Sequence, residues 1–240
     1  MKPGILKRVA SFVRNTPLHP QWLLVGNRDT ARWVAGHAKG RTLDIGCADR
    51  WIERWLPPGT QYLGLDYYLT GKHLYHARPD VFGDAGLLPF ADESVDTVLI
   101  LEVVEHLRQP QDALREISRI LRPQGGMLLS IPFLYPVHDA PHDYQRLTVH
   151  GIVRDVEASG MRVETVIPIL GSIETAGLLA CLAAGGTVMR LLENRSPLLL
   201  LAPIVLLMIP LINVVSWLSA RLFPSWDALT VGYRLYATKP

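Results

Sequence analysis

Residues 41–49 read Arg-Thr-Leu-Asp-Ile-Gly-Cys-Ala-Asp, a short β-prone run that ends at a glycine and continues into a turn of small and acidic residues. Apolar runs of the same kind recur downstream, and amphipathic helical patterns lie between them over 111–121 and 148–159. The further strand-like runs are 62–66, 96–101, 126–132 and 162–167. Strands that alternate with helices predict an α/β fold with a mostly parallel sheet and a ligand site at the carboxyl ends of the strands.

The composition excludes several broad classes of protein. Of the 240 residues, 49% are hydrophobic and 19% are charged, which is too apolar for a disordered chain. The net charge of +2 is too small to indicate binding to a nucleic-acid backbone, so no nucleic-acid partner is expected. Two cysteines, Cys47 and Cys181, cannot form a disulfide framework or a thiolate zinc site. We therefore expect a folded protein in a reducing, cytoplasmic compartment.

The turn at 44–50 is the expected ligand-binding loop. Its small residues allow a ligand to approach the backbone closely, and the helix predicted to follow it would offer free N–H groups. Asp66 follows Asp44 by 22 residues, a spacing at which a carboxylate accepts hydrogen bonds from ribose hydroxyls. A dinucleotide site would have the pattern G-x-G-x-x-G, whereas this turn has Gly46 followed by Ala48. The pattern favours a nucleoside without phosphates, and an NAD(P) oxidoreductase is the alternative.

The order of the motifs resembles that of the class I S-adenosylmethionine-dependent methyltransferases, in particular the methyltransferase type 11-like group. Residues 43–49 (LDIGCAD) resemble the family's first motif, D-x-G-x-G-x-G, and residues 64–66 resemble its second. The pattern is completed by 83–96, 101–107 and 121–126. The resemblance implies a Rossmann-like seven-stranded, mostly parallel sheet with an antiparallel last strand, and S-adenosyl-L-methionine as the cofactor. Ala48 departs from the motif, which usually has a glycine there.

The resemblance also implies which residues hold the cofactor. They are Asp44, Gly46 and Ala48 for the amino-acid portion, Asp66 for the ribose, Asp84 and Ala85 for the adenine, and Leu101 and Glu102 for the methionine side. Two of these residues have a plain structural alternative, because Asp44 can cap a strand end and Asp84 can form an Asx-turn. Their occurrence together in the family's order favours the cofactor site.

Glu102-x-x-Glu105-His106 is a polar cluster that follows the third strand-like run. At spacings i, i+3 and i+4 these three side chains are expected on one face of a helix. The cluster resembles the E-x-x-E-H of ubiquinone-pathway O-methyltransferases and small-RNA 2′-O-methyltransferases, in which these side chains hold a divalent metal ion. Glu102, Glu105 and His106 are thus candidate ligands of a divalent metal; otherwise His106 is a catalytic base or a substrate contact. A polar helix N-terminus is the alternative.

A second polar cluster lies in 132–148, after the fourth strand-like run and therefore above the reactive end of the cofactor. It resembles the H-D-x-x-x-D-Y-x-R-(L/Y)-T stretch of methyltransferases of uncertain substrate. Histidine and carboxylate side chains here can position a polar acceptor and take a proton from it. The expected catalytic residues are His106, His142 and Asp143, and the expected substrate residues are His138, Tyr144 and Arg146. In the alternative, Asp143 and Arg146 only pair with each other on a surface loop.

Residues 172–228 are an apolar insertion before the last strand-like run, 229–240. Between 196 and 220 about 25 residues carry no charge, which is long enough to cross a bilayer. The last strand must return to the sheet, so a single span is excluded, and a helical hairpin that dips into one leaflet is favoured. A full two-span hairpin and a soluble lid or dimer interface are the alternatives.

Residues 1–20 combine basic and apolar residues at the spacing of an amphipathic helix, without the long apolar core of a secretion signal. Three parts of the chain are therefore expected. They are an N-terminal helix over 1–20, a Rossmann-like methyltransferase domain over 21–171 with 229–240, and a hydrophobic helical hairpin over 172–228.

The favoured function is methyl transfer from S-adenosylmethionine to an oxygen of an amphipathic acceptor, such as a quinone precursor, a lipid or a lipid-linked sugar. A small-molecule or lipid-linked acceptor and a membrane surface are the expected partners, with peripheral or monotopic attachment at the inner face of the membrane. A non-catalytic membrane adaptor built on a methyltransferase fold is a further alternative. The sequence leaves the oligomeric state open.

Overall fold

The chain divides into two compact units, each of which is described by itself. The residues described by the computed structural model are 13–25, 29–72 and 77–240. The sheet unit comprises 29–169 and 232–240. The hairpin unit comprises 170–231 together with the described residues that precede 29.

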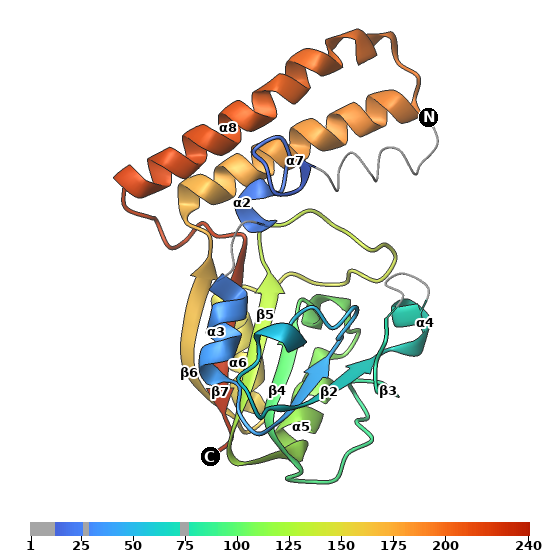
Figure 1. The fold of residues 1–240 in the computed structure, drawn as a ribbon, viewed down its shortest axis with the longest axis vertical. Helices are drawn as coiled ribbons and strands as arrows, with labels where there is room; N and C mark the ends of the chain where they lie inside the picture. The colour runs from blue at the N-terminus through green and yellow to red at the C-terminus, as the bar shows by residue number, and fades with distance from the viewer. Residues whose placement is uncertain (1–12, 26–28, 73–76) are drawn as a thin grey trace. The chain divides into compact units, whose positions relative to one another are not determined.

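The sheet unit is built on seven strands in the order β3-β2-β1-β4-β5-β7-β6 (Figure 1). The strands are β1 (Arg41–Ile45), β2 (Gln61–Asp66), β3 (Val81–Phe82), β4 (Val95–Leu101), β5 (Leu121–Pro132), β6 (Arg162–Ile169) and β7 (Gly232–Thr238). Strands β1 to β5 pair in parallel, and β7 runs antiparallel to both β5 and β6. The strand order reverses between β1 and β4, which is where ligands bind in sheets of this kind. The predicted Rossmann-like sheet with an antiparallel last strand is confirmed.

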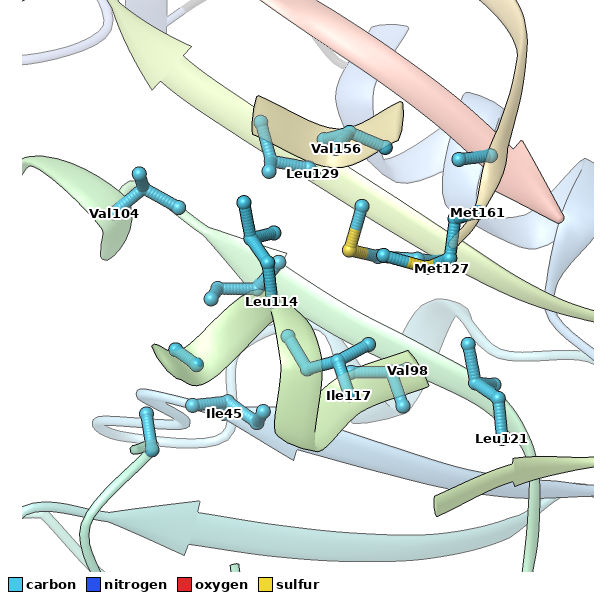
Figure 2. Packing of buried hydrophobic residues seen from close by; sticks show 14 of the residues in the cluster. Ile45, Val98, Val104, Leu114, Ile117, Leu121, Met127, Leu129, Val156 and Met161 are labelled. Carbon is cyan, nitrogen blue, oxygen red and sulfur yellow. The ribbon is translucent and has the colours of Figure 1, made fainter. Parts of the chain in front are cut away.

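Helices cover both faces of this sheet. They are α3 (Asp29–His37), α5 (Pro110–Ile120) and α6 (Val149–Ala158). Leu114 of α5 and Val156 of α6 share a buried cluster with Leu129 of β5 (Figure 2). Val34 of α3 belongs to a second cluster with Leu128, the neighbour of Leu129 on the same strand. Successive strand residues point to opposite faces, so the two clusters lie on opposite sides of the sheet.

Local sequence signals fix the ends of α5 and α6. Pro110 lies in the first turn of α5, where the missing N–H would have no helical partner in any case. The Thr148 hydroxyl caps α6 by accepting a hydrogen bond from the Gly151 N–H at 3.2 Å. Both helices agree with the predicted ranges to within one residue at each end.

The helix expected directly after the first turn is wrong. The fully described segment between β1 and β2 contains only η1 (Glu53–Trp55), a single 3-10 turn. Pro57 and Pro58 follow it in the sequence, and a proline ring blocks the continuation of a helix. Any backbone donors for a ligand at this end of β1 therefore come from the turn itself.

The hairpin unit consists mainly of two long helices that run side by side and are joined by a short connection (Figure 1). Its elements are α2 (Trp22–Val25), α7 (Ser172–Glu193), η4 (Pro197–Leu201) and α8 (Ala202–Leu222). Gly177 of α7 lies so close to α8 that an added Cβ would be 2.0 Å from the Ser216 Oγ. Helix α8 continues through Pro210. The predicted apolar helices before the last strand are confirmed.

A buried amide joins the N-terminal segment to α8. Asn213 Nδ2 donates hydrogen bonds to the backbone oxygens of Pro17 at 2.7 Å and His19 at 3.0 Å. Residues 14–20 are turns and bends, and the remainder of the helix predicted over 1–20 falls largely on 1–12, outside the described residues. The sheet unit begins at 29 rather than at the predicted 21, because the short helix α2 packs with α7 and α8.

Candidate active site

The carboxyl ends of neighbouring strands place the predicted cofactor residues along one edge of the sheet. Asp84 lies just beyond β3, Asp66 ends β2, Gly46 follows β1, and Leu101 ends β4. These four strands are consecutive in the sheet order β3-β2-β1-β4. The residues that are scattered over the sequence from 44 to 102 therefore follow one another along a single edge.

The turn after β1 is held against β2 by backbone hydrogen bonds. The N–H groups of Gly46 and Cys47 both donate to the Leu65 carbonyl, at 2.8 and 3.1 Å. Gly46 has a φ of +75°, and a Cβ there would lie 2.4 Å from a Val103 methyl group. Glycine is required at this position because a side chain would strain the backbone and collide with Val103.

Asp66 orders the same turn from the end of β2. Its Oδ2 accepts a hydrogen bond from the Ala48 N–H at 2.9 Å. The carboxylate thus fixes the backbone of the loop while it stands at the strand end, which is the place expected for a ribose-binding acid. Burial raises the pKa of Asp66, and hydrogen bonds from the backbone of Ala48 and Tyr67 oppose that rise.

Ala48 occupies the backbone conformation that explains the glycine usual in the motif. Its φ is +44° and that of Arg50 is +61°, so two non-glycine residues of this turn are left-handed. A left-handed L-residue costs about 1–2 kcal/mol relative to glycine.

We expect Ala48→Gly to raise the free energy of unfolding by about 0.5–1 kcal/mol, because relief of strain exceeds the added entropy of the unfolded chain. Urea unfolding measures the change. Ala35→Gly, in the right-handed α3, is the matched control and should lower the stability by about 1 kcal/mol. Equal losses for the two variants would contradict the strain assigned to Ala48.

Asp44 has a buried partner that the sequence analysis missed. The Tyr62 hydroxyl donates to Asp44 Oδ2 at 2.6 Å, and the Arg50 guanidinium lies 4.7 Å from the centre of the Tyr62 ring. Gly64 pairs with Asp44 in the β1–β2 register and Tyr62 lies two residues before it, which brings tyrosine and acid together diagonally on one face. Burial raises the pKa of Asp44 to about 7, although the hydrogen bond from Tyr62 opposes the rise.

We expect the folded protein to lose stability as the pH rises from about 4 to 7, because the raised pKa of Asp44 means that the folded state holds a proton that the unfolded state releases. Asp44→Asn cannot ionise, so the variant should lack a loss of about 2–4 kcal/mol over that window. Chemical unfolding at pH 4.5, 6 and 7.5 gives the comparison. Parallel pH profiles for the two proteins would show that Asp44 ionises normally.

The remaining cofactor residues are placed at the two ends of this edge. Asp84 is exposed, and its Oδ1 accepts a hydrogen bond from the Gly86 N–H at 2.8 Å. This contact is the Asx-turn that was the structural alternative for Asp84. The neighbouring Ala85 is buried. Glu102 is exposed and receives a hydrogen bond from the Ser130 hydroxyl. Its backbone N–H donates to the Ser130 carbonyl at 3.0 Å, which ties the end of β4 to β5.

The predicted single helix face for Glu102, Glu105 and His106 is wrong. Glu102 has a φ of +55° and precedes η3 (Val104–His106), a 3-10 turn of three residues. The polar group that the fold assembles instead is Glu105, His106 and His138, whose candidate ligand atoms lie within 4.8 Å of one another. His138 comes from the loop after β5, so sequence spacing gave no signal for this grouping.

Glu105 is the buried centre of this group. Its carboxylate is fully buried, and neither oxygen has a hydrogen-bond partner among the described residues. Oε1 lies 3.7 Å from His106 Nε2 and 3.9 Å from His138 Nε2. Burial raises the pKa of Glu105 to about 9, and the negative charge of Glu102 adds to the rise.

The loop over 133–148 is clamped onto η3. The Tyr144 N–H donates to the Glu105 carbonyl at 2.9 Å, and the Gln145 side chain donates to the carbonyls of Val104 and Leu107. The exposed Tyr144 also receives a hydrogen bond from Arg108 at 3.2 Å. These bonds explain why residues far along the chain meet at the end of β4.

Asp143 and Arg146 form the ion pair given above as the alternative to direct catalysis. Arg146 donates to both carboxylate oxygens, at 2.5 and 2.6 Å, and Asp143 Oδ2 also accepts from the His138 N–H at 2.9 Å. The hydrogen bonds from Arg146 lower the pKa of Asp143 to about 2. An acid with so low a pKa is a weak base, so this geometry favours a positioning role for Asp143.

Comparison with known proteins agrees with this layout. Residues 43–129, which lie wholly within the sheet unit, match a family model described as a methyltransferase domain. The chain carries a class I S-adenosylmethionine-dependent methyltransferase domain. A Mycolicibacterium smegmatis protein named as an S-adenosylmethionine-dependent methyltransferase is 31% identical over 157 residues, or 60% of each chain.

Other relatives of the methyltransferase domain have more specific names. A malonyl-acyl-carrier-protein O-methyltransferase of Erwinia pyrifoliae is 37% identical over 97 residues, 38% of this chain and 36% of that protein. A demethylmenaquinone methyltransferase of Renibacterium salmoninarum is 36% identical over 91 residues, 35% of this chain and 37% of that protein. The matches span between about a third and 60% of these relatives, so the similarity concerns the domain rather than whole proteins.

Solved structures share the fold of the methyltransferase domain at low sequence identity. A methyltransferase from Bacillus halodurans has a TM-score of 0.55 at 14% identity, covering 90% of this chain and 99% of that chain. An S-adenosylmethionine-dependent methyltransferase from Mesorhizobium loti has a TM-score of 0.51 at 15% identity, covering 91% and 97%. The cyclase SpnF reaches 0.57 at 15% identity with coverage of 98% and 96%, so the fold alone does not define a reaction.

Proposed function

We propose that this protein transfers a methyl group from S-adenosylmethionine to an oxygen of an amphipathic acceptor at a membrane surface. The observation that carries the cofactor part is the single edge on which Asp66, the Gly46 turn and Glu102 follow one another. The fit is supported by Gly46, because its left-handed backbone and its contact with Val103 allow no side chain there, so that no side chain of this residue covers the turn. In this proposal Asp66 binds the ribose and Asp84 the adenine, while Asp44 and Glu102 hold the methionine portion.

The reaction makes modest demands on the protein. Bound S-adenosylmethionine supplies a methyl group that is already activated by a positive sulfur. The chain has to align the acceptor oxygen with the C–S bond and exclude water. It also has to accept the hydroxyl proton as the C–O bond forms, while the electron pair of the broken C–S bond stays on sulfur. His142 is our candidate for that proton, because its Nδ1 lies 3.3 Å from the hydroxyl of Tyr144, a residue that we expect to contact the acceptor.

The amphipathic character of the acceptor is inferred from the hairpin unit. The exposed aliphatic residues of η4 and α8 are Leu198, Leu200, Leu201, Ile204, Leu206, Leu207, Met208, Leu211, Val214, Val215, Leu218 and Leu222. Only 17% of the most apolar window within Pro197–Leu222 is buried, whereas the core helix of a soluble protein is mostly buried. A soluble monomer seldom exposes so large an apolar surface, which favours a lipid environment around it.

Charged and aromatic residues at the ends of the helices support attachment to one leaflet. The Arg221 guanidinium lies 3.5 Å from the centre of the Trp217 ring, and Trp226 is 68% exposed. Such pairs are typical of the headgroup region. A two-span hairpin would carry Arg190 and Arg195, beside the α7–α8 connection, across the membrane, which the positive-inside tendency disfavours. We therefore propose monotopic attachment at the inner face of the membrane.

The decisive experiment separates the three functional hypotheses. Calorimetric titration of the full chain with S-adenosylhomocysteine and with NADH should show binding of the first only. Methyl-labelled S-adenosylmethionine incubated with the protein and membrane extract should then label an extractable small molecule or lipid. NADH binding would favour the oxidoreductase, and membrane association without binding of either cofactor would favour the adaptor.

A further inference from the structure

We propose that Glu105, His106 and His138 bind one divalent transition-metal ion, of the zinc or manganese kind. The side-chain geometry carries the binding site whether or not the protein transfers methyl groups. The catalytic role given to the ion below rests on the proposed function.

The three ligand atoms already surround a common point. Glu105 Oε1 is 3.7 Å from His106 Nε2 and 3.9 Å from His138 Nε2, and all three atoms lie within 4.8 Å of one another. Tetrahedral ligands at about 2.0–2.1 Å from zinc are ~3.4 Å apart. The two distances from Glu105 to the histidines exceed this separation by a few tenths of an ångström, and the histidines can adjust because His138 lies on a loop and His106 on a short 3-10 turn.

Each histidine is oriented by an acceptor on its other ring nitrogen. His106 Nδ1 lies 2.8 Å from the His142 carbonyl, which accepts only if that nitrogen carries the hydrogen. His138 Nδ1 lies 3.2 Å from Asp143 Oδ2 and 3.3 Å from the Pro136 carbonyl. The Nε2 atom of His106 is then left as a lone pair near Glu105; His138 Nδ1 also lies 3.4 Å from an Arg146 guanidinium nitrogen, and its two acceptors are the closer neighbours. Metal-bound histidines are oriented by carboxylates and carbonyls in this same way.

The arrangement leaves buried polar groups unsatisfied. The Glu105 carboxylate is fully buried, both oxygens have no hydrogen-bond partner among the described residues, and the Nε2 atoms of two histidines lie near it. A buried polar group without a hydrogen-bond partner costs free energy whether it is ionised or protonated. Arg146 does not serve this purpose, because its guanidinium is bound to Asp143. A metal ion would satisfy the carboxylate and both imidazoles at once.

The donor set indicates the kind of ion and its use. Two imidazoles and one carboxylate suit zinc, manganese or iron, whereas magnesium and calcium prefer oxygen ligands throughout. Three protein ligands leave at least one position open for an acceptor hydroxyl. A hydroxyl bound there would have a lowered pKa, so that its proton passes more readily to His142 or water before the C–O bond forms.

The test is metal binding by the full, tag-free chain after treatment with a chelator. Titration calorimetry with Zn²⁺ and Mn²⁺ should show one site, with Mg²⁺ and Ca²⁺ at least ~10-fold weaker. Asp143→Asn changes a residue that orients a ligand and should weaken metal binding by ~10- to 100-fold. Glu105→Gln and His138→Gln each remove a ligand and should weaken metal binding by more than that. His150→Gln, on the exposed face of α6, should bind like the unmodified protein.

Binding of S-adenosylhomocysteine, measured on the same samples, separates this proposal from the proposed function. A protein that binds the nucleoside but no transition metal would overturn the metal site alone. Equal zinc affinity in the parent, Glu105→Gln and His138→Gln would overturn it too, as would magnesium binding as tightly as zinc. Far-UV circular dichroism checks the folding of each variant, and Glu105→Gln should fold well because the amide has nearly the same size and shape as the carboxyl group it replaces.

Discussion

Replacing Asp66 by asparagine is expected to weaken the binding of S-adenosylhomocysteine by about 10- to 100-fold. The proposed bond from a ribose hydroxyl to a carboxylate contributes about 1.5–3 kcal/mol, and an amide nitrogen cannot accept it. Asparagine keeps one oxygen that can accept from the Ala48 N–H, so the turn after β1 should stay ordered. Calorimetric titration of the parent and the variant measures the ratio of the dissociation constants.

Asp92→Asn is the control for this experiment. Asp92 is an exposed acid in the loop before β4 and pairs with Arg119, away from the end of β2. The control has the same change in net charge, and its affinity for the nucleoside should stay within about twofold of the parent. Equal affinities for Asp66→Asn and the parent would remove the ribose role from Asp66.

Leu200→Glu combined with Leu207→Glu is expected to weaken binding to anionic phospholipid vesicles by at least ~100-fold. The two leucine side chains are 86% and 74% exposed, and burial of each in lipid contributes about 1.5–3 kcal/mol. Each glutamate would also be repelled by the negative lipid surface. Flotation of the protein with vesicles at several lipid concentrations gives the partition coefficient.

Leu87→Glu is the matched control, because Leu87 is 78% exposed but belongs to the sheet unit. It should float with vesicles as the parent does. Sedimentation of the same proteins without lipid tests the alternative of a dimer interface. A parent dimer that the double substitution converts to a monomer, with vesicle binding unchanged, would contradict membrane attachment through this surface.

The parts of the fold that were predicted correctly depend on short-range patterns. The nearly continuous apolar run of β4 and the Thr148 cap of α6 are each recognisable within a dozen residues. The expected helix after β1 failed because the residues before Pro57 have helical propensity, while the prolines that follow leave room for only one turn. Local propensity was sufficient for long elements and insufficient for short ones.

The candidate site divides in the same way. Asp66 and Gly46 could be placed from the sequence, because the end of a parallel strand fixes where the next residues stand. The contact of Tyr62 with Asp44 could not be predicted in this way. It depends on the register of β1 and β2, in which Gly64 pairs with Asp44. The ion pair of Asp143 with Arg146 was one of two possibilities in the sequence, because side chains three residues apart in a loop have no fixed distance from each other.

The positions of the longer strands along the chain, the acids at their ends and the apolar character of the hairpin can all be recognised in the sequence, because each depends on neighbouring residues. The contact of Glu105 with His138, and the absence of Glu102 from that group of candidate ligands, depend on the folded chain. His106 and His142 are 36 positions apart, and their contact depends on a loop clamped over η3 by bonds to backbone carbonyls. Such bonds carry no periodicity, so residue spacing gives no sign of where they close.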